Sequence, residues 1–165
     1  AYEIKECDWS SDVCSSDLAA LALFAMFAVL VVHWNDLPDR VPSHFDLAGN
    51  PTRWTGPYRL WFMPVLGLGL YVLLTVLTKV RVRYNAPFGL DSSREDVRRE
   101  ARGMLTAMKA VVLLGFAWIH VQVMMIALGL LKSPGPWAML GLVGATMVVT
   151  AVYVWRFRRI ARGEA

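Results

Sequence analysis

Residues His33–Trp54, with the sequence HWNDLPDRVPSHFDLAGNPTRW, form a polar segment between two long apolar runs. The segment contains three prolines, two histidines, three aspartates and one glycine. A plain connection between two helices needs only a few residues, and each proline restricts the backbone around it. We therefore interpret this segment as a shaped loop, and loops that sit on a rigid scaffold often carry function.

The runs on either side of this loop belong to a strongly apolar chain. Hydrophobic residues make up 56% of the 165 residues, and the mean hydropathy is +0.44. A helix needs about 20 apolar residues to cross about 30 Å of hydrocarbon. The sequence predicts an all-α integral membrane protein, a four-transmembrane-helix bundle with a structured extracytoplasmic loop between helices 1 and 2. The predicted spans are residues 18–34, 60–78, 104–131 and 137–155.

The first eighteen residues, AYEIKECDWSSDVCSSDL, resemble the conceptual translation of a sequencing adapter fused to a truncated gene. We expect this segment to make no specific contacts with the bundle, and residues 19–165 to form a single membrane domain. Both cysteines, Cys7 and Cys14, lie in the segment, so they say nothing about redox compartment. Without its one lysine and five acidic residues, 16 basic residues face 8 acidic ones, and the net charge rises from +4 to +8.

Positive charge is distributed unevenly among the loops. The first loop has three arginines and three aspartates, and the third loop has only Lys132. The positive-inside rule therefore places the second loop and both termini on the cytoplasmic side of the membrane. An excess of this kind sets topology, and we expect no binding to nucleic acid. The basic residues of the second loop and the C-terminal tail are Lys79, Arg81, Arg83, Arg94, Arg98, Arg99, Arg102, Arg156, Arg158, Arg159 and Arg162.

Within the first loop, alternating polarity and turn residues predict a short hairpin. Val41–Phe45 would pair near Arg53–Trp54 through a turn at Asp46–Pro51. The hairpin is either a structural cap on the helix ends or a surface that recognises a peptide or envelope ligand outside the cell. A metal site at His33, His44 and Asp46 is a third reading, but no ligand pair has a diagnostic spacing, so we assign no metal. The candidate recognition residues are Pro38, Pro42, His44, Phe45, Asp46, Gly49 and Trp54.

The third predicted span contains two polar residues, His120 and Gln122. Polar residues inside a membrane are costly and usually face the bundle interior, which makes them candidates for function. His120 is either a neutral histidine bonded to a neighbouring helix or a group that transfers protons or contacts a ligand. Lys109, near the cytoplasmic end of the same span, is expected to extend towards the headgroups.

The second loop is expected to form a short helix from about Ser93, which either continues through Gly103 into the third span or breaks there. Its arginines are read as a topology signal, or as a contact for anionic lipid or a cytoplasmic regulator. The residues concerned are Arg81, Arg83, Arg94, Arg98, Arg99 and Arg102.

The first loop also carries a family resemblance. Leu37-Pro38, Val41-Pro42, His44-Phe45, Gly49 and Trp54 occur in the order typical of a bacterial membrane family defined by a short domain of unknown function (domain of unknown function 1648). The similar region covers about residues 34–79. The same domain forms the N-terminal part of SdpI-like proteins, which give immunity against the sporulation-delay toxin. The resemblance implies a multi-pass membrane protein and points towards immunity.

Two functional classes remain open. In the first, the chain is a sensing or toxin-immunity-like protein that uses the outer loop for recognition. In the second, it is an accessory component of a transporter, with a polar path at His120 and Gln122. No Gly-rich phosphate loop and no metalloprotease helix motif occurs in the sequence, and we expect neither an enzyme nor a cofactor.

Overall fold

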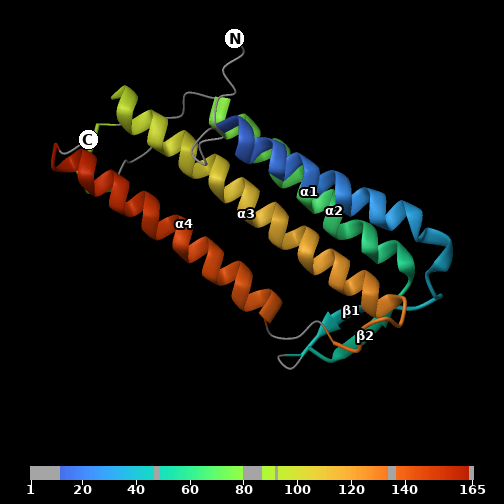
Figure 1. Cartoon of the computed structure of the whole chain (residues 1–165). Helices are drawn as coiled ribbons and strands as arrows, with labels where there is room; N and C mark the ends of the chain where they lie inside the picture. The colour runs from blue at the N-terminus through green and yellow to red at the C-terminus, as the bar shows by residue number, and fades with distance from the viewer. Residues whose placement is uncertain (1–11, 47–48, 80–86, 92, 134–136, 164–165) are drawn as a thin grey trace, which may run out of the picture.

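The computed structural model describes residues 12–46, 49–79, 87–91, 93–133 and 137–163. Four helices in this part of the chain are long and apolar enough to cross a membrane (Figure 1). The predicted fold class, a four-helix membrane bundle with a structured loop between the first two helices, is confirmed. The helices are α1 (Asp12–Val32), α2 (Phe62–Lys79), α3 (Glu95–Ala127) and α4 (Trp137–Ala161).

The helices alternate in direction, and α3 is the central one. It contacts α1, α2 and α4, whereas α4 lies on the side of α3 away from α1 (Figure 1). The two strands lie at one end of the bundle, which we call the hairpin end. The start of α3 and the end of α4 lie together at the other end, which we call the basic end.

Most helix boundaries differ from the predicted ones, and the third helix ends at Ala127 and not at residue 131. The first helix begins at Asp12, inside the adapter-like segment, and the fourth continues to Ala161. The third begins at Glu95 and passes through Gly103 without a break, so the predicted short helix and the third span are one element. It ends before Gly129, whose φ of 74° suits the left-handed residue that closes many helices.

The predicted hairpin between the first two helices is confirmed. Strand β1 (Val41–Phe45) pairs antiparallel with β2 (Pro51–Thr55), so the second strand is longer than expected. Register shifts between Pro42 and Phe45 make the ladder irregular, as happens where a β-bulge bends a strand. Short 3-10 helices flank the strands, η1 (Trp34–Asp36) before them and η2 (Pro57–Trp61) after them.

Three groups of buried side chains occur along α3. At the hairpin end, β1, η2 and α3 meet α1, and in the middle Leu113 packs with two alanines of α1. A third group lies at the basic end, where α3 meets the last turns of α4. A Cβ atom at Gly67 of α2 would lie 3.4 Å from the side chains of Leu23 and Leu113, which is van der Waals contact, so the three helices meet at this position. The hairpin is therefore held on a packed helical base.

Candidate functional site

The start of β1 is packed against the helices. Val41 and Pro42 are fully buried, and Val41 belongs to the same apolar group as Leu30, Leu60 and Met124. These residues come from α1, η2 and α3, so Val41 belongs to an apolar group to which three other elements contribute. Proline has no N–H to donate to a ladder, and in a two-stranded sheet each strand is an edge strand. The burial of Val41 and Pro42 therefore attaches β1 to the bundle.

The turn of the hairpin is built around Asp46. Its carboxylate accepts hydrogen bonds from the backbone N–H of Asn50 at 2.7 Å and from the Asn50 side-chain amide at 3.2 Å. Its backbone N–H and C=O bond to Asn50 and Gly49 respectively, each at 3.0 Å. Gly49 has a φ of 83°, which glycine adopts without a steric penalty. Asp46 and Gly49 thus shape the turn.

The end of β1 and most of β2 are exposed. His44 and Arg53 are paired across the strands, and the neighbouring Trp54 is 50% exposed. Ser43 supports this pair, because its hydroxyl donates to the carbonyl oxygen of Arg53 at 3.3 Å and lies 3.5 Å from Nδ1 of His44. An imidazole and a guanidinium therefore lie opposite each other across the strands, and the indole next to them in β2 is exposed as well.

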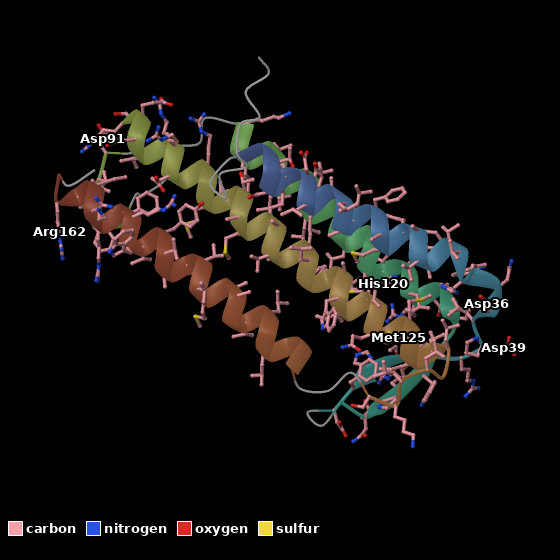
Figure 2. The ribbon with its side chains drawn as sticks, in the orientation of Figure 1. Asp36, Asp39, Asp91, His120, Met125 and Arg162 are labelled. Atoms are coloured by element: carbon pink, nitrogen blue, oxygen red, sulfur yellow. The ribbon has the colours of Figure 1, made fainter. Side chains whose placement is uncertain are left out.

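Aromatic rings connect the hairpin to the helices below it. The ring of Trp61 lies 5.8 Å from that of Trp34 and 6.1 Å from that of Phe27, both tilted, which is a favourable geometry for aromatic pairs. In η1, Nδ1 of His33 lies 3.2 Å from a carboxylate oxygen of Asp36, and both side chains are exposed. Asp36 and Asp39 lie at the outer edge of this end (Figure 2).

The seven predicted recognition residues lie in the hairpin and the segment just before it, but they differ in burial and in structural role. Within the described residues, no group of three histidine, cysteine or acidic side chains is close enough to hold a metal ion. Arg53 is also exposed. It was not among the predicted recognition residues, because its position opposite His44 depends on the register of the strands. Pro42 is buried, Asp46 and Gly49 form the turn, Phe45 is half-buried, and Pro38, His44 and Trp54 are exposed.

His120 is buried one helical turn below the hairpin core, with 1% of its surface exposed (Figure 2). The backbone of Met26 in α1 lies beside its imidazole. Among the described residues, however, neither ring nitrogen has a hydrogen-bond partner of ordinary geometry. A buried polar group without a partner is costly, so His120 is an unusual feature of this interface.

Gln122 does not share this position. It is half-buried, and residues two apart on an α-helix point about 200° away from each other. Leu113 lies two turns from His120 towards the basic end and is fully buried among apolar neighbours. The two polar residues of α3 therefore do not form one continuous surface.

The structure identifies a buried polar residue that sequence reasoning misplaced, Lys109. Its side chain is only 2% exposed instead of extending to the headgroups. The ammonium group donates to the hydroxyls of Ser16 at 2.9 Å and Thr75 at 3.2 Å, and it lies 4.8 Å from the centre of the Tyr71 ring. Lys109 thus connects α1, α2 and α3. A signal for this burial was present in the sequence. Lys109 lies eleven residues before His120, which is three helical turns, so the two residues share one face of α3.

The contact with Ser16 also bears on the adapter-like segment. Ser16 lies in residues 1–18, which we expected to make no specific contact with the bundle, and that expectation is wrong at this residue. The foreign origin of the segment stays a prediction.

At the basic end, several of the predicted arginines pair with acids of the same helix. Glu95 accepts hydrogen bonds from Arg98 at 2.7 Å and from Arg102 at 3.0 Å, and Arg94 pairs with Asp96. Arg99 is exposed, while Arg81 and Arg83 lie outside the described residues. Exposed pairs of this type contribute about 0–1 kcal/mol each. They stabilise the first turns of α3 and reduce the charge available to a partner.

A comparison of the sequence with known protein families finds a match that includes the hairpin. Residues 21–68 match the family described as Domain of unknown function (DUF1648). The match runs from the later part of α1 through the hairpin to the first turns of α2. No curated protein and no solved structure matches the chain. The chain is a four-helix membrane protein whose hairpin region is similar to this domain of unknown function.

Proposed function

We propose that this chain is a non-enzymatic recognition protein of the bacterial inner membrane, of the sensing or toxin-immunity type. Its hairpin meets a peptide or envelope ligand outside the cell. The observation that carries the proposal is that the start of β1 is buried against the helices, whereas His44, Arg53 and Trp54 of the same hairpin are exposed. A rigid surface of this kind loses little conformational entropy when it binds, and tryptophan and arginine are frequent anchors at interfaces.

The proposed orientation follows from the charges at the two ends. At the hairpin end, three arginines are balanced by three aspartates. At the basic end, the three arginines of α3 are balanced by three acidic residues, but α4 ends with Arg156, Arg158 and Arg159 and has no acidic residue. Further positive charge lies at and after the end of α2, at Lys79, Arg81 and Arg83. The positive-inside rule then places the basic end and both termini in the cytoplasm and the hairpin outside.

A labelling experiment tests this orientation. In a background with Cys7→Ser and Cys14→Ser, we expect Asp39→Cys to react with a membrane-impermeant maleimide in cells whose inner membrane is intact. Ser93→Cys should react only after that membrane is permeabilised, because it lies just before α3 at the basic end. The reverse pattern would place the hairpin in the cytoplasm and exclude an external ligand.

The recognition role is tested by removing the exposed side chains. We expect the wild-type chain to restore the growth of a strain from which its own gene has been deleted. The strain is grown in spent medium that contains the secreted toxin against which the chain is proposed to protect. The variant His44→Ala/Trp54→Ala should give no protection, although it inserts and melts like the wild type. Both side chains are exposed, so their loss removes recognition and little packing.

The matched control is Thr52→Ala, which changes another exposed residue of β2 and should protect fully. Full protection by the double variant would show that the hairpin is a structural cap. A double variant that loses stability and protection together would show the same.

A second candidate function rests on His120. A buried imidazole without a partner among the described residues suits an accessory component of a transporter, in which this ring contacts a proton or a solute. In that case His120→Ala changes solute uptake, whereas His44→Ala/Trp54→Ala does not. The recognition proposal expects the opposite dependence, so one pair of variants separates the two classes.

A further inference from the structure

The last turns of α4 have two different faces. Tyr153, Phe157 and Ile160 are spaced by four and three residues, as one face of a helix requires, and each is at least 94% buried. Phe157 and Ile160 pack with Val97 of α3. This face attaches the end of α4 to the start of α3, so the basic end is rigid.

The opposite face changes from apolar to cationic along one line. Val148 is 63% exposed, Val152 42% and Trp155 57%. Arg159 and Arg162 continue the same spacing of three and four residues, and both are exposed. The backbone N–H of Arg162 still bonds to the carbonyls of Arg158 and Arg159, each at 3.1 Å, so the helical geometry extends to it. We call these five residues the α4 stripe.

The order of residues in the stripe corresponds to the layers of a bilayer. The two valines lie within the apolar span Leu140–Ala161, where exposed side chains contact acyl chains. Tryptophan prefers the headgroup level. Arg159 and Arg162 lie about 6 and 10 Å further along the helix axis, which is the depth of the lipid phosphates. The guanidinium of Arg159 lies 5.1 Å from the centre of the Trp155 ring, which orients it beside the indole.

We propose that the α4 stripe binds an anionic phospholipid of the phosphatidylglycerol type. An acyl chain lies along Val148 and Val152, and the phosphate accepts hydrogen bonds from Arg159 and Arg162. Guanidinium groups bind phosphate oxygens in a bidentate geometry. Arg162 has no ion-pair partner among the described residues, unlike Arg98, Arg102 and Arg156.

A lipid fits better than a soluble phosphate ester because the cationic part continues directly from the lipid-facing part of the same helix. Arg158 lies outside the stripe, and its guanidinium is placed over the Phe88 ring at 5.4 Å. The inference is independent of the hairpin, since the stripe lies at the other end of the bundle (Figure 2).

The test measures lipid retention by the full chain. The protein is extracted from bilayers that contain equal amounts of phosphatidylglycerol and phosphatidylcholine, and bound lipids are counted by native mass spectrometry. We expect the wild type to retain phosphatidylglycerol preferentially. Arg162→Gln should lower that preference about fivefold, as expected for one cation at an anionic surface, and Arg159→Gln/Arg162→Gln about twenty-fold or more.

The matched control is Arg99→Gln, which removes one exposed cation from the same end of the bundle but from α3. It should leave the preference unchanged. An equal loss in Arg99→Gln would show a diffuse charge effect and overturn the site. Displacement of the lipid by millimolar glycerol 1-phosphate would show a soluble phosphate site and overturn the lipid proposal. All variants concern exposed residues, and circular dichroism confirms that they are folded.

Discussion

Val41→Asp is expected to detach the hairpin from the bundle while the four helices remain inserted. The side chain of Val41 has no exposed surface and contacts apolar residues from α1, η2 and α3. A carboxylate there would lose its hydration without gaining a partner, at a cost of about 3–5 kcal/mol. Hydrogen–deuterium exchange should show loss of protection in residues 41–55, with α3 protected as before.

Val41→Ala provides the graded control for this experiment. It removes two methyl groups and should cost about 2 kcal/mol, so the hairpin stays docked with reduced protection. If Val41→Asp leaves the hydrogen–deuterium exchange of β1 and β2 unchanged, the packing of Val41 does not hold the hairpin in its position. In that case His44, Arg53 and Trp54 would not form a preorganised surface.

The second large effect is expected at Lys109. Ser16→Ala/Thr75→Val removes two hydroxyls that accept hydrogen bonds from the buried ammonium group. Hydrogen bonds to charged groups contribute about 1.5–3 kcal/mol in soluble proteins, and hydrogen bonds within membranes average about 0.6 kcal/mol. We therefore expect a loss of about 1–4 kcal/mol in the free energy of unfolding, measured by titration with SDS.

Adding Lys109→Met to the double variant should restore most of this loss. Methionine has a similar length and no charge, and apolar replacements of buried ionic groups are often neutral or stabilising. Thr146→Val on α4 is the matched control, because its hydroxyl bonds only to carbonyls of its own helix, Leu142 and Val143. A double variant as stable as the wild type would mean that these hydroxyls do not stabilise the charge.

Much of the fold could be predicted because it depends on local properties of the sequence. A run of about 20 apolar residues specifies a membrane span wherever it occurs. The hairpin followed from alternation in VPSHF and from the turn residues Asp46, Gly49 and Asn50, whose hydrogen bonds are made within the turn itself. The helix ends were less accurate, since Glu95–Arg102 is polar but still helical through its own ion pairs.

The candidate site could be predicted only in part. The turn role of Asp46 and Gly49 was predicted and is confirmed, whereas a recognition role for His44 and Trp54 stays a prediction. Which side of a two-stranded hairpin is exposed depends on what the bundle offers beneath it. Arg53 could not be identified, because its position opposite His44 depends on the register of the two strands.

The sequence by itself determined the number of spans, the hairpin between the first two and the excess of positive charge at one end. Each of these depends on composition over a few residues or over one helix. Only the tertiary structure decided that Lys109 is bonded to α1 and α2, that His120 is buried below the cap, and that α4 presents one stripe from valine to arginine. The physical reason is that the partner of a helix face comes from residues distant in the chain, and only packing selects which face each helix buries.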